Sequence, residues 1–449
     1  MSKRNIILAL ALVLILAFVL VSCDKKSYTV TFDSQGGTQI QSVTVEKGDK
    51  VSEPKTPYLQ HHTFLGWYDG DKLWDFSTKV RGDINLVAKW TLTEYNITFD
   101  SKTGSNNKAT FTVQDLPLRL YEAKADGDKH FLGWEMNGNR INKLVSVGDV
   151  TIKAIYQGEP TELIYEEHND HVVVIGAMEQ TTDLVIPSTY NGKPVTKIAD
   201  GAFKSNEDIY TLIIEGGVAE IGKEAFKDCK NLQKVVFGDD LKKISDSAFM
   251  NCSGIYEAPI PNGLEYIGAK AFKGCSFLES INLPNGLRYL GEDFILDCPN
   301  VKYDMYTNGE VQDKYLGNWL IEYADREARS IVLKEGTVGI ASYAFYQMTN
   351  LRTIHMPAGV KYIGSHAFFF CYNVTVVNLN SDLEYIGMYA FYRLQKLKTI
   401  TIPLSVTTIG MKAFEKCVAL TITCEAEKAP EGFGQDWNGG REVIYAGQN

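Results

Sequence analysis

Apolar side chains recur at one fixed interval over the C-terminal two-thirds of the chain. Ala-Phe pairs end at Phe203 and at every 23rd residue up to Phe272, and the same spacing returns from Phe345 to Phe414. An apolar residue, isoleucine in most repeats, lies five positions before each phenylalanine, and a short L-x-x-I-x-[IL] stretch follows it. This stretch predicts a short strand whose first, fourth and sixth side chains are buried.

A repeat of 23 residues is too small to bury its own apolar face. We therefore expect the repeats to stack into a solenoid over residues 160–422, with one continuous core. The period fails between Phe294 and Phe345, which are 51 residues apart. An irregular turn or a packed insertion is expected at 299–330.

The two ends of a solenoid need caps, because an uncovered last repeat exposes the core. Residues 163–187 are the expected N-terminal cap, with a strand at 172–175. Residues 423–449 are the expected C-terminal cap, and the strand pattern is expected to end at Thr423-Cys424.

The N-terminal third contains a second, different repeat. The segment Tyr28 to Ser34 recurs 67 residues later as Tyr95 to Ser101, and the F-L-G-W of Phe64 to Trp67 recurs at the same distance. Alternating apolar and polar residues with Gly-rich turns are typical of strands. Two compact β-rich modules are therefore predicted, at 28–91 and 95–157.

The first residues predict export from the cytoplasm. Lys3 and Arg4 precede an unbroken apolar run from Ile6 to Val21, which has the charge and length of a signal peptide. The run ends in L-V-S-C at Cys23, which resembles a bacterial lipobox. That resemblance implies a signal peptide at 1–22, lipid attachment at Cys23 and a linker to residue 27. An ordinary signal peptide or an anchor helix is the alternative.

Both repeats resemble known families. The modules, with V-T-F-D, Gly-Gly, F-x-G-W and A-K-W, resemble the internalin-type B repeat, also called the Listeria–Bacteroides repeat, which implies a small β-grasp-like fold serving as a stalk or spacer. The pattern L-x-x-I-x-I-P…V-x-x-I-G-x-x-A-F-x-x-C resembles the BspA-like leucine-rich repeat of bacterial surface lipoproteins. The expected fold class is thus a β-rich leucine-rich-repeat solenoid preceded by two β-grasp-like modules.

Composition narrows the possible functions. The chain has 449 residues, 45% of them hydrophobic, and a formal net charge of −10, which excludes a mainly disordered chain and argues against nucleic-acid binding. H-E-x-x-H, G-x-S-x-G and C-x-x-C are absent from the sequence. His168-Asn169-Asp170-His171 could hold a metal, but a solvated hairpin turn is the favoured interpretation. We expect no enzymatic activity, no cofactor and no metal.

Six cysteines share one position, two to four residues after the repeat phenylalanine. They are Cys229, Cys252, Cys275, Cys298, Cys371 and Cys417. Buried free thiols are the favoured interpretation, since Met348 and Leu394 take the same position in other repeats. A metal ladder or a chain of disulfides is the alternative, and Cys417 with Cys424 is the pair best placed to bridge.

An aromatic stripe is the candidate ligand-binding surface. Its members recur at two repeat positions and are Tyr266, Tyr289, Tyr343, Tyr346, Tyr362, Phe369, Tyr385, Tyr389 and Tyr392. Tyrosine gives a large contact area at low entropic cost and is enriched at binding surfaces. Packing of the stripe against 299–330 or against the next repeat is the alternative.

The resemblance implies a lipid-anchored protein on the extracytoplasmic face of a bacterial cell membrane, exposed at the cell surface. Its solenoid would bind an extracellular protein without catalysis, in adhesion to a host or to other cells. Capture of a glycan or nutrient for an uptake system is the alternative function, and an unrecognised hydrolase is a third. The expected partners are an extracellular protein or glycan and, through the N-terminal lipid, the membrane.

Overall fold

The computed structural model describes residues 27–447 except 102–104, 106, 128, 158–161 and 179–180. The chain divides into two compact units. One runs up to residue 124 and includes Trp134–Ala154, and the other comprises Ala125–Gly133 and the chain from Ile155 onward. The predicted signal peptide and Cys23 lie outside the described residues. Within the described part, no helix has both the length and the apolar content needed to cross a bilayer.

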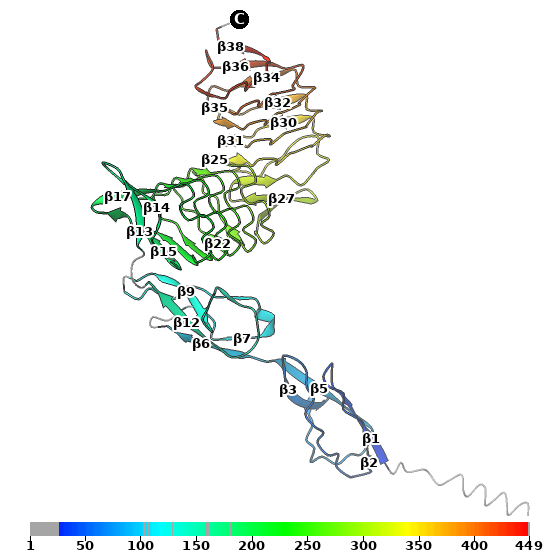
Figure 1. Ribbon diagram of the computed structural model, residues 1–449. Coiled ribbons are helices and arrows are strands. Elements are labelled where there is room, and N and C mark those ends of the chain that lie inside the picture. The colour runs from blue at the N-terminus through cyan, green and yellow to red at the C-terminus, as the bar shows by residue number, and fades with distance from the viewer. Residues whose placement is uncertain are drawn as a thin grey trace, which may run out of the picture. The chain divides into compact units, whose positions relative to one another are not determined.

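The first module is a five-stranded sheet of order β2-β1-β5-β3-β4, shown in blue in Figure 1. Its strands are β1 (Ser27–Asp33), β2 (Val43–Glu46), β3 (His62–Asp69), β4 (Lys72–Leu73) and β5 (Ile84–Leu92). β1 and β5 pair in parallel, and the other neighbours are antiparallel. Alternation in β1 buries Val30 and Phe32, and Phe32 packs edge to face on the buried Trp67 at 4.9 Å.

The second module has the same topology. Its main sheet has the order β10-β9-β12-β6-β7, and β12 pairs in parallel with β6 as β5 does with β1. Its elements are β6 (Tyr95–Asp100), β7 (Thr110–Phe111), the 3₁₀ helix η1 (Val113–Asp115), β8 (Leu118–Arg119), β9 (Phe131–Met136), β10 (Asn139–Ile141), β11 (Lys143–Leu144) and β12 (Val150–Tyr156). Trp134 is buried like Trp67, which explains why the F-L-G-W motif recurs.

The remaining chain is a solenoid made of two stacks of repeats. The strands of the first stack are β13 (Leu163–Glu167), β14 (Val172–Ala177), β15 (Asp183–Ile186), β16 (Thr189–Tyr190), β17 (Lys193–Ile198), β18 (Thr211–Ile214), β19 (Glu220–Ile221), β20 (Lys234–Val236), β21 (Lys243–Ile244), β22 (Glu257–Ala258), β23 (Tyr266–Ile267), β24 (Ser280–Ile281) and β25 (Tyr289–Leu290). One sheet runs β13-β14-β17-β19-β21-β23-β25, and shorter sheets β15-β18-β20 and β22-β24 form another side.

The 23-residue period is the register of this stack. Ile221 pairs in parallel with Ile244, and Ile244 with Ile267. The buried rings of Phe226, Phe249 and Phe272 stack with their centroids 5.3 Å apart. The predicted strand at 172–175 is confirmed as part of β14, and β13 pairs with it in antiparallel fashion. This hairpin covers the N-terminal end of the stack.

The second stack follows the same plan. Its strands are β26 (Asp304–Asn308), β27 (Val311–Leu316), β28 (Trp319–Glu322), β29 (Gly339–Ile340), β30 (Thr353–His355), β31 (Tyr362–Ile363), β32 (Val376–Asn378), β33 (Tyr385–Ile386), β34 (Thr399–Ile402), β35 (Thr408–Ile409), β36 (Thr421–Cys424), β37 (Gly432–Phe433) and β38 (Glu442–Tyr445). Phe345, Phe368, Phe391 and Phe414 form its ring ladder.

The segment 299–330 starts the second stack instead of continuing the first. β26, β27 and β28 are antiparallel neighbours, and β28 then pairs in parallel with β29. Tyr315, Trp319 and Tyr323 are buried there. The expectation of one continuous core is therefore wrong, because the buried side chains form two clusters, one in each stack.

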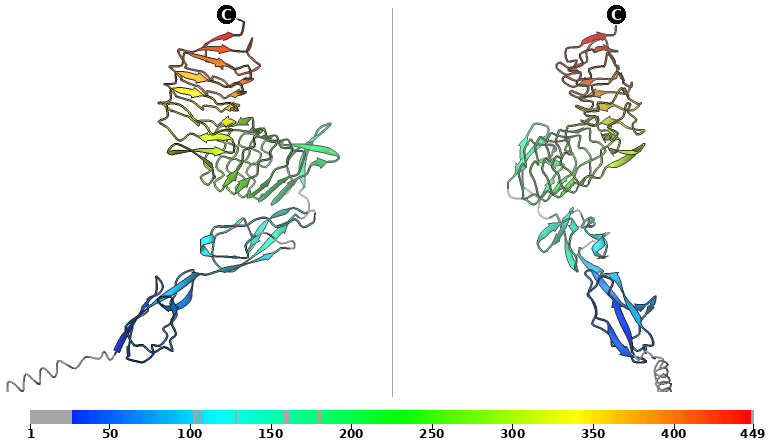
Figure 2. Two further views of the ribbon diagram at one scale, coloured as in Figure 1. Left: turned by 180° about the vertical axis from the view of Figure 1, so that it is seen from behind. Right: turned by 90° about the vertical axis from the view of Figure 1, so that its right-hand side faces the viewer.

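The two stacks meet at a bend, visible between β25 and β27 in Figures 1 and 2, which we call the elbow. The ring of Tyr289, in β25, lies 5.7 Å from that of Tyr385, in β33, between centroids. Glu292 accepts hydrogen bonds from His366 Nδ1 at 3.0 Å and from the Tyr343 hydroxyl at 3.4 Å. The last repeat of the first stack therefore contacts the side of the second stack.

The C-terminal residues form a further repeat. The strand pattern does not end at Thr423-Cys424, as was expected, because β36 includes both residues and β38 pairs with β36 in parallel. β37 likewise extends the other sheet. The cap is instead provided by Trp437, which is buried and contacts the last ladder ring, Phe414, at 6.1 Å.

Candidate functional site

The nine aromatic residues of the predicted stripe lie in two separate groups. Tyr266, Tyr289, Tyr362 and Tyr385 begin the short strands β23, β25, β31 and β33. Tyr266 stacks on Tyr289 at 4.4 Å, and Tyr289 meets Tyr385 edge to face. Because Tyr289 and Tyr385 belong to different stacks, these rings form the inner contact of the elbow.

Burial of this elbow group leaves little surface for a ligand. Tyr362 is 6% exposed and stacks on Trp319 at 5.8 Å. Burial, together with nearby Glu384, raises the pKa of Tyr362 to about 12. Burial also raises the pKa of Tyr385 and of Tyr266. For these four tyrosines the geometry fits packing better than binding.

The other five stripe residues lie on one face of the second stack. With His366, Phe370 and Tyr372 they form what we call the aromatic surface, whose members are Tyr343, Tyr346, His366, Phe369, Phe370, Tyr372, Tyr389 and Tyr392. His366 and Phe370 were not singled out from the sequence. His366 lies 23 residues from both Tyr343 and Tyr389, so the period itself could have identified it.

The aromatic surface consists of two parallel ladders of rings. His366 stacks between Tyr343 and Tyr389, with centroid distances of 4.8 Å and 5.2 Å. Phe369 stacks between Tyr346 and Tyr392 at 5.9 Å and 4.4 Å. Tyr343 is 37% exposed and the others are half-buried. The rings thus cover one another's faces and present their edges and hydroxyl groups to solvent.

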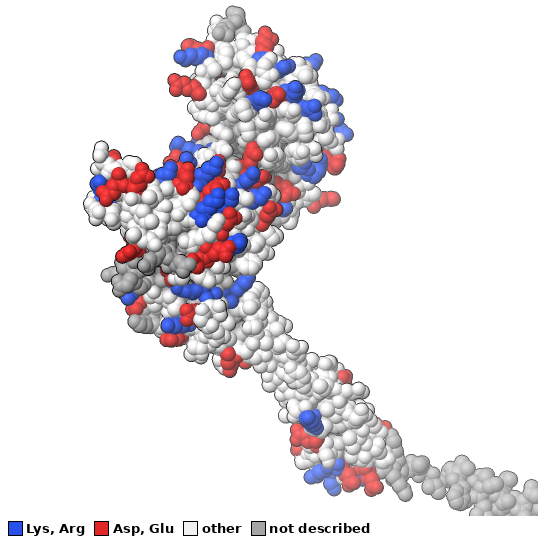
Figure 3. Space-filling view, in the orientation of Figure 1, with Lys and Arg blue, Asp and Glu red and all other residues white. Residues whose placement is uncertain are grey.

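The same repeat positions carry charged residues in the first stack. Where the second stack has Tyr346, the first has Lys204 and Lys227, and Glu224 takes the position of Tyr343. Glu224 binds both lysines, at 2.6 Å and 3.2 Å. Figure 3 shows both signs of charge interspersed over this stack. Since the repeat folds with ion pairs at these positions, the aromatic residues are not required for the fold.

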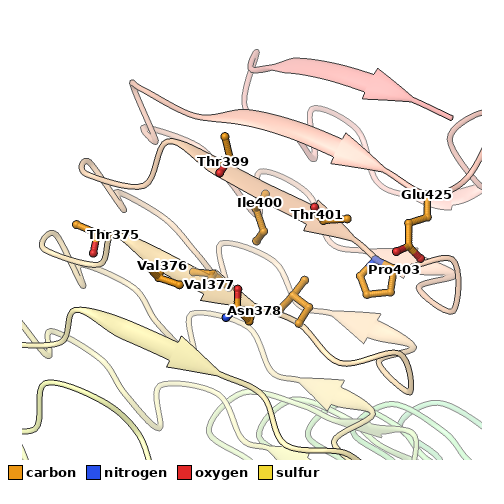
Figure 4. Close-up of a pocket in the computed structure, with 10 residues that line it drawn as sticks. Thr375, Val376, Val377, Asn378, Thr399, Ile400, Thr401, Pro403 and Glu425 are labelled. Atoms are coloured by element: carbon orange, nitrogen blue, oxygen red, sulfur yellow. The ribbon is translucent and has the colours of Figure 1, made fainter. Parts of the chain in front are cut away.

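A polar groove of about 340 Å³ crosses the strands β32 and β34, as seen in Figure 4. Asn378, Thr399 and Thr401 line its floor, and Glu425 lies at one end. The two strands belong to different sheets. The Glu425 carboxylate accepts a hydrogen bond from the Leu404 amide at 2.9 Å, which leaves the groove without a strongly directional binding group.

The cysteines are free thiols, including Cys417 and Cys424. Each of the six repeat cysteines donates its S–H to the carbonyl of a phenylalanine 26 residues earlier, as Cys252 does to Phe226 at 2.9 Å. Burial raises the pKa of Cys371 to about 12 and that of Cys417 to about 11. Thiols in this state are inert, and no cluster of three or more potential metal ligands occurs among the described residues. His168 and His171 lie in the exposed turn between β13 and β14.

Comparison with known proteins assigns the family. Residues 193–313 and 322–428 match the BspA type Leucine rich repeat region in six copies. Residues 28–89 match the Listeria-Bacteroides repeat domain. The chain belongs to the BspA-type leucine-rich-repeat family, and its first module is a Listeria-Bacteroides repeat.

Individual relatives share shorter segments. Internalin H of Listeria monocytogenes is 36% identical over 114 residues, which is 24% of this chain and 20% of that protein. A putative membrane protein of Evansella cellulosilytica is 43% identical over 111 residues, 24% of this chain and 17% of that protein. The chain spans a fifth or less of the length of the curated relatives that it matches. Among solved structures, a T. pallidum leucine-rich-repeat protein is 20% identical and covers 57% of this chain and 87% of its own, with a TM-score of 0.31.

Proposed function

We propose that this chain is a cell-surface protein that binds another protein without catalysis, through the aromatic surface, and so acts in adhesion. The observation that carries the proposal is the replacement of Lys and Glu by aromatic residues at matching repeat positions. The fold does not need that replacement. Contiguous apolar groups at a protein surface mark interaction sites, and aromatic residues are enriched among the contacts that contribute most to binding.

Ring geometry favours a protein over a glycan. A sugar packs its C–H bonds onto the electron-rich face of an aromatic ring. In the two ladders those faces are already taken by neighbouring rings, such as Phe369 between Tyr346 and Tyr392. The exposed edges and hydroxyl groups suit the mixed apolar and hydrogen-bonding contacts of a protein interface. Glycan or nutrient capture remains the second candidate function.

The proposed location is the extracytoplasmic face of the cell membrane. Lipid attached at Cys23 would hold the chain there, and the two modules would act as a stalk for the solenoid. Several acyl chains give stable anchoring, because each buried CH₂ contributes about 0.8 kcal/mol. Relatives named as a membrane protein and as an internalin support a surface location.

The test is affinity capture of host or bacterial surface proteins by the full chain, with a variant carrying Tyr346→Lys, Phe369→Lys and Tyr392→Lys. Lysine occupies the matching positions in the first stack, so the variant should fold. We expect captured proteins to be lost at least tenfold in the variant. A control with Thr399→Lys and Thr401→Lys alters the polar groove and should retain them.

Capture that survives the triple variant and fails in the groove variant would move the binding surface to the strand face. Binding to a glycan array, lost in the triple variant, would favour the second candidate function.

A further inference from the structure

An open apolar cleft of about 410 Å³ lies at the elbow. One wall is the last repeat of the first stack, residues 291–299, and the other comprises Tyr303, Ile321 and residues 341–343 of the second stack. We call it the elbow cleft. It adjoins the aromatic surface, because Tyr343 belongs to both.

The cleft exists because the first stack ends there. β25 pairs only with β23, and the next strand along the chain, β26, begins a new sheet. Phe294, Ile295 and Cys298 therefore form a wall without a following repeat in the same sheet. Leu296, at its rim, is 43% exposed.

The apolar character of the wall exceeds what the fold requires. Ile295 takes the position after the phenylalanine, where Lys204, Lys227 and Lys273 stand in earlier repeats. Leu296 takes the position of Gly274 in the preceding repeat. Polar residues and glycine serve at these positions elsewhere, so two large aliphatic side chains beside an open cleft point to a contact outside the chain.

Charge and hydrogen bonding add chemical detail. Asp293 and Asp297 both line the cleft, and Lys273 lies 3.7 Å from Asp297. With two carboxylates against one ammonium, the rim favours a cation. The Ser342 hydroxyl, on the opposite wall, is buried and has no hydrogen-bond partner among the residues that the structure describes.

We propose that the elbow cleft receives a large apolar side chain of a partner protein, flanked in the partner by lysine or arginine that pairs with Asp293 and Asp297. The volume falls within the range of about 300–1,000 Å³ that is typical of ligand sites. Anchor side chains buried in such pockets contribute most of the binding energy of an interface. This inference rests on the proposed protein-binding function and names the chemistry of the partner.

The experiment probes an array of short random-sequence peptides with the full chain. Peptides retained by the wild type should be enriched in Leu, Phe or Trp next to Lys or Arg. Retention should fall at least tenfold for Leu296→Asp and for the double variant Asp293→Asn, Asp297→Asn. The matched controls are Leu404→Asp, at a leucine that is 68% exposed, and Asp239→Asn, at an exposed loop aspartate. Both should retain the same peptides as the wild type, and unchanged circular dichroism would establish folding of all variants.

Enrichment of acidic or wholly polar peptides, or equal retention by Leu296→Asp, would overturn the inference. Self-association of the chain that Leu296→Asp abolishes would also overturn it, in favour of a second copy as the occupant. Protein capture that depends on Tyr346, Phe369 and Tyr392 would persist in each of these cases, so the inference can fail while the proposed function stands.

Discussion

Single residues show which parts of a repeat depend on hydrogen bonding. The Cys252 thiol donates to the Phe226 carbonyl, which also accepts the Cys229 amide. Met348 and Leu394 fill the same position without an S–H donor. The position therefore requires buried volume first, and the thiol adds one weak hydrogen bond.

From this we predict that Cys252→Ala lowers the free energy of unfolding by about 1–2 kcal/mol, as expected for a small cavity plus a lost hydrogen bond. Met348→Cys should be close to neutral on this reasoning only if volume matters less than the donor. A larger loss in Met348→Cys than in Cys252→Ala would support volume as the dominant factor. Urea denaturation of both variants gives the comparison.

Glu292 makes the elbow sensitive to acid. Its hydrogen bond with His366 is the main reason that the pKa of Glu292 lies below the ordinary value of 4.5. A carboxylate with a lowered folded-state pKa contributes stability above its unfolded-state pKa and loses it as the pH falls through the folded-state value. We predict that Glu292→Gln removes part of the fall in thermal midpoint below about pH 4.5. Glu335→Gln, at an exposed glutamate, should leave the acid limb of the pH profile unchanged.

At the scale of the repeat, backbone contacts set the sharp corner after each Ile. A Cβ built on Gly387 would lie 2.3 Å from the Ser365 amide nitrogen, closer than such atoms approach in proteins. Gly387→Ala is therefore expected to lower stability by about 1–3 kcal/mol, the usual cost of overpacking. Gly286→Ala is the control, because its nearest neighbour would be 3.7 Å away. Equal thermal midpoints for the two variants would contradict this account of the corner.

The sequence period predicts as much of the solenoid as is repeated. Register, buried strand positions such as Leu278, Ile281 and Leu283, and the phenylalanine ladder all follow from residues 23 apart. The hairpin of β26 and β27 does not, because 299–330 lacks the period. Contact between Tyr289 and Tyr385 joins residues on two differently directed stacks, and no local pattern encodes that geometry. The prediction could name the aromatic residues but could not separate the elbow group from the aromatic surface.

At the scale of the whole solenoid, the elbow is the weakest join. Stability of a repeat protein is approximately the sum of repeat terms and nearest-neighbour interface terms. Within each stack, neighbouring repeats share ladder hydrogen bonds, rings and aliphatic contacts. Across the elbow no described strand of the first stack pairs with one of the second, and side chains such as Tyr289, Glu292 and their partners make the contact. The two cores are thus coupled less strongly to each other than their own repeats are.

We therefore predict that Tyr289→Ala combined with Tyr385→Ala separates the unfolding of the two stacks. Hydrogen exchange under increasing denaturant should show the β19–β25 amides and the β29–β35 amides opening at different concentrations in the double variant, and closer together in the wild type. Because these tyrosines lie outside the phenylalanine ladders, each stack should keep its own protection at low denaturant. Tyr266→Ala, which removes a ring that stacks only within the first stack, is the control and should shift the first stack alone. A single shared opening in the double variant would mean that the elbow transmits stability through the backbone at 299–330 and not through these rings.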